Sequence, residues 1–173
     1  MYFEHMLTLH TRVSGTVAID DRLILPYELR EKSRLRARTE SGQDVALLLQ
    51  RGSVMRDGDL MSGPEGKIVQ IVAAAEPVYQ IASSDAHLLL RCAYHLGNRH
   101  TQVQLGDGWL RIRQDPVLKD MAEGLGASVS ACDAPFEPEA GAYGGGHHHG
   151  EHHALAPVPV RQRIHRPSDR TDS

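Results

Sequence analysis

The chain is poor in the features that mark several classes of protein. Cysteine occurs only twice in 173 residues, at Cys92 and Cys132, and the pair lacks CxxC spacing. We therefore expect reduced thiols rather than a disulfide or a thiolate metal site. No stretch approaches the ~20 consecutive apolar residues that a membrane-spanning helix needs, and the first residues, MYFEHMLTLHTRV, lack an apolar core for export. These absences predict a cytoplasmic protein that does not insert into a membrane.

Excess charge and catalytic motifs are also missing. The formal net charge is −3 with histidine neutral, so bulk charge does not favour nucleic-acid binding. We find no nucleophile with a nearby base and no paired carboxylates. The glycine-rich GAYGGG at 141–146 precedes histidines rather than the Lys-Ser/Thr of a phosphate-binding loop. An enzyme is therefore the class that the sequence favours least.

The first part of the chain has the pattern of short strands separated by turns. RLRAR alternates charged and apolar residues, which is typical of a half-buried strand. The turn signal RDGD at 56–59 separates further apolar runs. We expect strands in RLRAR (34–38), VALLLQ (45–50) and KIVQIV (67–72), with one or two more supplied by MLTLHTRV (6–13) and GTVAI (15–19). Residues 1–75 are therefore predicted to form a small β-sandwich or barrel.

The pattern then changes to alternating strands and helices. A helix is expected after Ser83 or Ser84 as its cap, ending at Gly97, and a second one begins at Asp115-Pro116 and ends before Gly126. The first helix carries an apolar stripe of Ala86, Leu89, Leu90, Ala93 and Leu96; that of the second is Leu118, Met121, Ala122 and Leu125. Strands are expected at 77–82, 101–105, 109–113 and 127–136, with a hairpin loop at 106–108. Residues 76–137 are thus predicted to be a βαββαβ domain of the ferredoxin-like type, which makes the whole chain α+β.

Residues 138–173 are predicted to be a disordered, histidine-rich tail, because they lack apolar periodicity. Within it, YGGGHHHGEHHA (143–154) gathers five of the eleven histidines: His147, His148, His149, His152 and His153. Neutral imidazoles bind Ni²⁺, Zn²⁺ and Cu²⁺, and the adjacent glycines let several rings turn toward one ion. A purification tag is disfavoured because Gly150 and Glu151 interrupt the run and further sequence follows it. A solvated tract without a ligand role is the remaining alternative.

The other histidines are scattered. His5 and His10 fall in an expected strand, and we assign them ordinary roles there. His87 and His95 fall in the first and last turns of an expected helix, where His95 complements the helix dipole. His165 lies among tail arginines and is expected to assist the cluster only weakly.

Three segments in order resemble a known family. AYHLGNRHTQVQ (93–104), PVLKDMAEGLGASV (116–129) and APFEPEAGAY (134–143) are similar to the C-terminal half of the urease accessory protein UreE family. The stretch at 25–61, from LPYELREK to RDGDLM, resembles the N-terminal half of that family. The resemblance therefore extends to Tyr143, and the histidine-rich tail follows it.

The resemblance implies a nickel metallochaperone that is dimeric through its second domain. By the family pattern, the histidine of GNRH, His100, is a nickel ligand that meets its counterpart in the second copy across a two-fold axis. The implied partners are the urease nickel-handling GTPase and the complex of apo-urease with its accessory proteins. In one departure from some members, Gln114, Asp115 and Pro116 stand where those members carry additional histidines.

Two alternatives remain at this point. A metal store would hold Ni²⁺, Zn²⁺ or Cu²⁺ on the tail and would not need His100. An interaction module would bind peptides through its two domains, and a chelator would not affect it.

Overall fold

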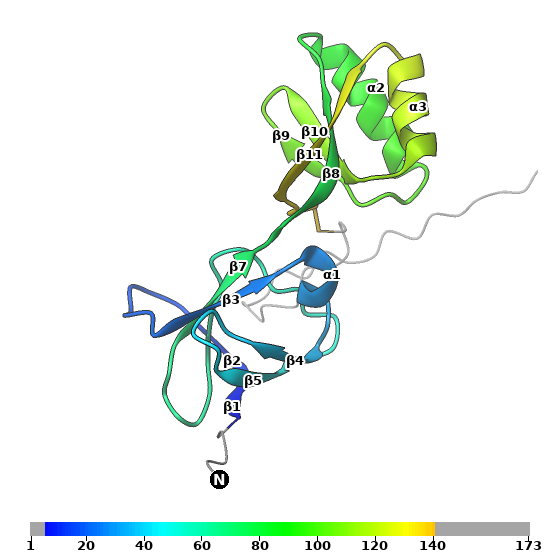
Figure 1. The fold of residues 1–173 in the computed structure, drawn as a ribbon. Helices are drawn as coiled ribbons and strands as arrows, with labels where there is room; N and C mark the ends of the chain where they lie inside the picture. Colours follow the sequence, from blue (N-terminus) through cyan, green and yellow to red (C-terminus); the bar gives the residue numbers. More distant parts are fainter. Residues whose placement is uncertain (1–5, 141–173) are drawn as a thin grey trace, which may run out of the picture.

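The computed structural model describes residues 6–140, which form two lobes connected where one strand leads into the next at Ala74 (Figure 1). The first lobe contains strands β1 to β7 and the short helix α1 (Tyr27–Arg30), and the second contains strands β8 to β11 with helices α2 and α3. The chain is thus mixed α+β with more strand than helix in the described part. No helix of residues 6–140 is long and apolar enough to cross a membrane.

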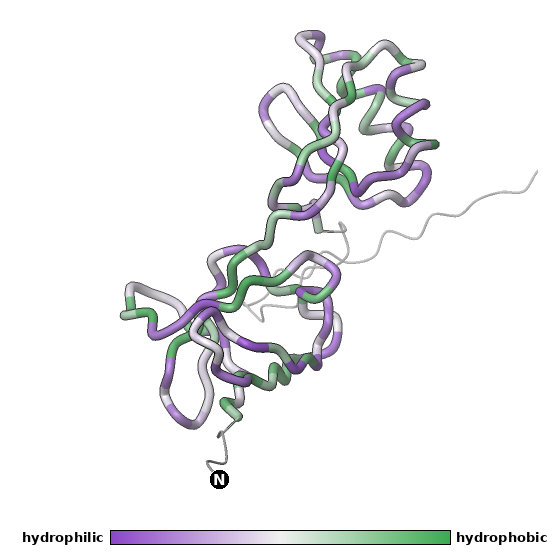
Figure 2. The backbone as a smooth tube through the Cα atoms, in the orientation of Figure 1, coloured by the Kyte–Doolittle hydropathy of each residue, from purple (hydrophilic) through white to green (hydrophobic). Residues whose placement is uncertain are grey.

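The first lobe consists of two small sheets that share one core. One sheet has the order β1-β5-β4, and the other has the order β2-β6-β7-β3. Alternate residues of both sheets point inward, among them Leu9, Leu23, Leu47 and Ile71, which are fully buried. Figure 2 shows β7 as a mainly hydrophobic segment, whereas β4, with three arginines in five residues, is largely hydrophilic. The strands are β1 (Leu7–Leu9), β2 (Thr11–Val13), β3 (Asp21–Leu25), β4 (Arg34–Arg38), β5 (Asp44–Leu48), β6 (Leu60–Ser62) and β7 (Val69–Ala73).

The predicted strands of this lobe are confirmed at RLRAR, in most of VALLLQ and in most of KIVQIV. Both strands at the start of the chain come from MLTLHTRV, and GTVAI forms none. Val17 and Ile19 are 38% and 43% exposed, whereas Leu23 and Leu25 of the unpredicted strand β3 are 0% and 3% exposed. Strand β3 pairs in parallel with β7, so its apolar residues reach the core and those of GTVAI do not. Helix α1 and strand β6 were not predicted either. Helix α1 is a single turn and strand β6 has three residues, so neither is long enough to show a periodic pattern.

The second lobe has a four-stranded sheet with the order β11-β8-β10-β9. Its elements follow one another as βαββαβ: β8 (Ala75–Ala82), α2 (Ala86–Gly97), β9 (Gln104–Gly106), β10 (Trp109–Arg113), α3 (Pro116–Gly124) and β11 (Ser128–Pro135). Both helices lie on one face of the sheet (Figure 1). Buried residues from both helices and from the strands, such as Ile81, Leu96, Ile112 and Ala122, form one core cluster.

The predicted start of α3 is confirmed, and that of α2 needs a correction. The Asp115 carboxylate accepts hydrogen bonds from the backbone N–H groups of Val117 and Leu118, at 2.8 and 3.1 Å, with Pro116 as first helical residue. At α2 the cap is Asp85, whose carboxylate accepts from the N–H of His87 at 2.9 Å. The serines that we expected to cap it lie too early, since only the residue directly before the helix can reach the free N–H groups of its first turn.

The hairpin after β9 and the stripe on α2 also differ in detail from the expectation. Gly106 pairs with Trp109, so the loop is Asp107-Gly108 alone. Leu90, which we placed in the core stripe of α2, is 69% exposed, while Cys92 and Leu96 on the same helix are fully buried. The stripe of α3 is confirmed, since all of its predicted residues belong to the core cluster or pack against it.

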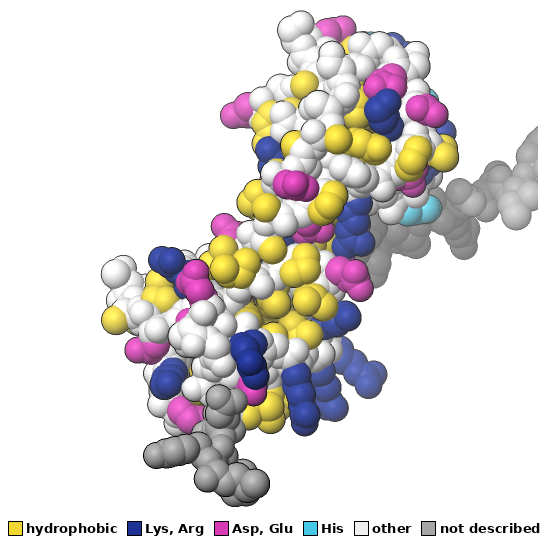
Figure 3. Space-filling model, in the orientation of Figure 1, with side chains coloured by type: hydrophobic (Ala, Val, Ile, Leu, Met, Phe, Trp, Pro, Cys, Tyr) yellow, Lys and Arg dark blue, Asp and Glu magenta, His cyan; other side chains and the backbone are white. Residues whose placement is uncertain are grey.

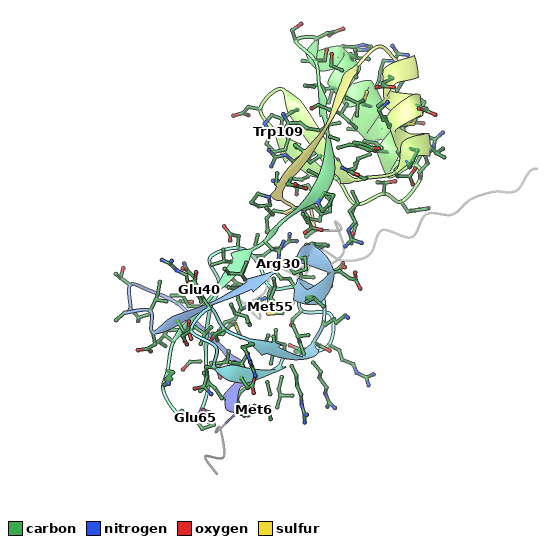
Figure 4. All side chains as sticks on the ribbon, viewed as in Figure 1. Met6, Arg30, Glu40, Met55, Glu65 and Trp109 are labelled. Carbon is green, nitrogen blue, oxygen red and sulfur yellow. The ribbon has the colours of Figure 1, made fainter. Side chains whose placement is uncertain are left out.

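The two lobes are joined at α1 as well as by the chain connection. Tyr27 is 3% exposed, and its ring packs edge-on against Phe136 at a centroid distance of 5.6 Å. The Arg30 guanidinium, labelled beside α1 in Figure 4, is fully buried and forms an ion pair with Glu137. Pro138 and Glu139, the first residues of the predicted tail, also lie against the two lobes: the Pro138 carbonyl accepts from Arg56 at 2.7 Å, and the Glu139 N–H donates to Val103 at 2.9 Å.

Candidate metal centre

His100 lies in the turn that ends helix α2. The N–H of Thr101 donates to the carbonyl of Leu96 at 3.2 Å, and the N–H of His100 donates to the carbonyl of Gly97 at 2.9 Å. This pair of bonds is a Schellman motif, in which the residue after the C-cap takes a left-handed backbone conformation. His100 has φ = +55°, and it is the one non-glycine residue of the described range 6–140 with positive φ.

Helix α3 ends in the same motif, which gives an internal comparison. There the N–H of Ala127 donates to Ala122 at 3.1 Å, the N–H of Gly126 donates to Glu123 at 2.9 Å, and Gly126 has φ = +104°. Our prediction that Gly126 follows the end of α3 is confirmed. Helix α2 ends at Gly97 as predicted, but Gly97 is not the left-handed residue of its end. The left-handed position of α2 belongs to His100, where a side chain raises the backbone energy and glycine would not. Backbone strain of this kind is concentrated at functional sites.

The imidazole of His100 is exposed and makes no hydrogen bond or ion pair with another residue of 6–140. The neighbouring histidines are engaged differently. The ring of His95 packs edge-on against Tyr94 at a centroid distance of 5.4 Å. The backbone carbonyl of His95 accepts a hydrogen bond from the Arg99 guanidinium at 3.0 Å. His87 is exposed in the first turn of α2, and the His10 ring bonds Thr11 at 2.8 Å. Both ring nitrogens of His100 are thus open to a metal ion or to a partner.

A cleft of about 610 Å³ connects His100 to the end of the described chain. Its lining includes Tyr27, Glu31 and Arg56 from the first lobe, His100 from the second, and Glu139 with Ala140. Whatever follows Ala140 therefore begins at the same cleft that His100 lines. The predicted tail ligands His147, His148, His149, His152 and His153 lie outside the described residues, as do His5 and His165.

Helix α2 also presents two large apolar side chains to solvent. Leu90 is 69% exposed and Tyr94 is 66% exposed. They are four residues apart, so they lie on one face of the helix, one turn above the other. The next turn along that face leads into the segment that carries His100. An apolar face of this kind, close to a candidate ligand, is suited to contact with another protein surface.

Acidic side chains and thiols do not complete a site around His100. Within residues 6–140, no group of three or more His, Cys, Asp or Glu side chains is arranged to hold a metal ion. Cys92 is fully buried, and burial raises the pKa of its thiol, which disfavours the thiolate that a metal would need. Both cysteines are free, as the sequence predicts. A complete site that includes His100 would need ligands from beyond this range or from another molecule.

Comparison with known proteins identifies the chain at both lobes. The model of the UreE urease accessory protein N-terminal domain matches residues 4–74, and that of the C-terminal domain matches residues 76–162. Urease accessory protein UreE of Nitrosospira multiformis is 58% identical over 172 residues, covering 95% of this chain and 98% of the relative. That of Janthinobacterium sp. is 60% identical over 170 residues, covering 96% and 100%, and that of Ectopseudomonas mendocina is 51% identical over 150 residues, covering 84% and 90%.

These matches define the class first: the chain is an accessory protein and not an enzyme, as its lack of catalytic motifs predicts. It belongs to the urease accessory protein UreE family, and the resemblance found in the sequence is confirmed over both lobes.

Proposed function

We propose that this protein is a nickel metallochaperone that acts in urease maturation. In this proposal a homodimer holds Ni²⁺ between the paired His100 side chains, and histidines of the tail complete the site. The ion is cargo, so the site must release it as well as bind it. The observation that carries the proposal is the placement of His100: an exposed, unengaged imidazole at a strained backbone position, next to an apolar helix face.

The exposed face of α2 supports the pairing of two copies. Leu90 and Tyr94 would be covered if the same face of a second molecule met them across a two-fold axis. A two-fold contact repeats each residue, so a single His100 near the axis becomes two ligands on one ion. Tyrosine is enriched in such interfaces because its large ring buries much area with little conformational freedom lost.

The position of the chain end supports the contribution of the tail. Ala140 lines the cleft that His100 also lines, and His147 follows seven residues later. A chain of that length spans up to about 24 Å when extended, so the first tail histidines can reach His100 within the same molecule. The proposed ligand set is therefore His100 with His147, His148, His149, His152 and His153 in varying combinations.

The chemistry of the proposed ligands fits nickel but does not select it alone. Imidazole binds Ni²⁺, Cu²⁺ and Zn²⁺, and affinities generally rise from Ni²⁺ to Cu²⁺, so Zn²⁺ and Cu²⁺ should also bind in vitro. Ligands from separate side chains can dissociate one at a time, which allows transfer to another protein. The family name supports a role in urease maturation. The receiving partners in this proposal are the urease nickel-handling GTPase and the apo-urease accessory complex, in the cytoplasm.

We also propose a finer description of the two lobes. The strand order β11-β8-β10-β9 with both helices on one face supports a ferredoxin-like second domain at 76–137. The shared core of the two small sheets supports a sandwich-type first domain at 1–75. Residues 138–173 are then the metal-binding tail.

Nickel titration by calorimetry tests the proposal on four proteins: the full chain, a truncation after Tyr143, and that truncation with either His100→Gly or His10→Ala. We expect one ion per dimer to remain after truncation, to be lost with His100→Gly and to persist with His10→Ala. His10 is the matched control because its imidazole is also exposed but lies in the first lobe. Loss of all binding on truncation alone would instead show a tail-based store of Ni²⁺, Zn²⁺ or Cu²⁺.

A further inference from the structure

The outer face of the sheet β1-β5-β4 combines positive charge with apolar surface. On β4, Arg34, Arg36 and Arg38 point outward, opposite Leu48, Ala46 and Asp44 of β5 respectively. On the other side of β5, Thr8 of β1 is the partner of Ala46. Figure 3 shows Lys and Arg side chains gathered on the side of the first lobe where Figure 1 labels β4 and β5.

Two of these arginines have no carboxylate partner among residues 6–140. Asp44 is the one acidic residue in strands β1, β4 and β5. It already forms an ion pair with Arg38 at 2.9 Å. Arg34 and Arg36 are exposed, and neither side chain has a hydrogen bond, ion pair or ring contact with another residue of 6–140. Their positive charge is therefore available to a partner.

A shallow groove runs between the two arginines and strand β1. Its volume is about 420 Å³, and its lining includes Met6, Thr8, Arg34, Arg36, Ala46 and Leu48. Ala46 is only 8% exposed and forms the floor, while Met6 and Leu48 are 38% and 47% exposed. Figure 4 labels Met6 beside β1, at the lower end of the first lobe. The groove thus offers an apolar floor and walls beside two unpaired guanidinium groups.

Protection of an edge strand explains only part of this arrangement. Strand β4 is at the edge of its sheet, and charged residues on an edge discourage pairing with other chains. That role needs no apolar groove next to the charges. Exposed Met6 and Leu48, which flank the nearly buried Ala46, instead create a surface that gains from being covered.

We propose that this groove docks an acidic segment of a partner protein that also carries apolar side chains. Glutamate or aspartate side chains would pair with Arg34 and Arg36, and an adjacent leucine or similar residue would lie between Met6 and Leu48. Guanidinium groups suit this role because they bind carboxylates through two parallel hydrogen bonds. The surface belongs to the first lobe and includes none of the proposed metal ligands, so docking does not depend on the metal role.

Fluorescence anisotropy on the metal-free full chain tests this proposal. The probe is a short fluorescein-labelled peptide in which glutamates alternate with leucines, and the comparison peptide has glutamine at every glutamate position. The test variant is Arg34→Glu/Arg36→Glu. Its matched control is Arg22→Glu/Lys67→Glu, which makes the same change in charge at exposed positions on the first lobe outside this sheet.

We expect the acidic peptide to bind the unmodified chain and the control, and to bind the test variant about tenfold more weakly, because two favourable charge pairs become repulsive. Binding should also weaken with added salt, and the glutamine peptide should bind less tightly than the acidic one. Equal binding by the test and control variants would overturn the proposal, as would equal binding of the two peptides.

Two further measurements exclude other occupants of the groove. If deleting residues 1–5 strengthens peptide binding tenfold or more, the chain's own first residues fill the groove and the proposal is wrong. If Arg34→Glu/Arg36→Glu changes the sedimentation coefficient of the metal-free chain from that of the control, the face joins copies of this chain instead. Unchanged behaviour in both measurements supports an external acidic partner.

Discussion

Arg30 and Glu137 form an ion pair between two lobes although they are 107 residues apart in the sequence. The guanidinium is fully buried, and its remaining donors are used by backbone carbonyls of both lobes: Leu25 at 3.1 Å, Met55 at 3.3 Å and Phe136 at 2.6 Å. Burial lowers the pKa of Arg30, while the charges of Glu76 and Asp57 raise it. A buried guanidinium whose three nitrogens all form hydrogen bonds thus fixes the segment after β11 against α1.

Substitution of Arg30 by methionine should destabilise the protein strongly. The change removes one donor from each of three carbonyls, of which Leu25 keeps the N–H of Ala74 at 2.9 Å, and it removes the buried partner of Glu137. We therefore expect the free energy of unfolding to fall by about 3 kcal/mol. Arg34→Met is the control, because Arg34 is exposed and unpaired, and it should change stability by less than about 0.5 kcal/mol. Urea denaturation measures both. Equal small effects would show that the Arg30 network contributes little.

Reverse substitutions at the two helix ends should have different effects on stability. Gly126→Ala should lower the free energy of unfolding by about 1 kcal/mol, because it introduces a side chain at positive φ. His100→Gly relieves the same strain and should leave stability equal or higher, while it removes the proposed ligand. Thermal unfolding of the metal-free proteins distinguishes the cases. A marked loss of stability with His100→Gly would mean that the imidazole has a structural role.

The sequence predicts the elements that local pattern determines. Strand β4 was found from alternation and α3 from its Asp115-Pro116 start, since both signals lie within a few neighbouring residues. Strand β3 was missed because its place depends on parallel pairing with β7, and nothing local distinguishes its apolar residues from those of GTVAI. Long-range pairing overrides local preference in such cases.

The candidate site was predictable in identity but not in conformation. His100 was named through the family resemblance, whereas its left-handed backbone was not, because the usual signal for that conformation is glycine. The role of Arg30 was not predicted, since a charged residue is normally exposed and its partner Glu137 lies 107 residues away in the sequence. The exposure of Leu90 was not predicted either, because an apolar residue at helical spacing is usually part of the core.

The exposed face of α2 predicts the oligomeric state. Tyr94→Glu should convert the proposed dimer into a monomer, because it places two carboxylates near each other across the two-fold axis. Val117→Glu is the control: Val117 is 72% exposed on α3, so the same charge is added to an exposed apolar position on the other helix. Sedimentation of the metal-free full chain measures the outcome. Dissociation by both variants, or by neither, would argue against a dimer through Leu90 and Tyr94.

If histidines bind the metal ion, its affinity should fall as the pH is lowered. A metal ion binds the neutral imidazole, so protons compete for the ring nitrogens, and affinity should fall by tenfold or more between about pH 8 and pH 5. The dependence should be steeper in the full chain than in the truncation after Tyr143, because more histidines compete for protons when the tail takes part. Calorimetric nickel titrations of both proteins at several pH values measure this difference. Equal affinity at pH 8 and pH 5 would contradict histidine ligation, and equal slopes for the two proteins would show that the tail contributes no ligands to the ion that His100 holds.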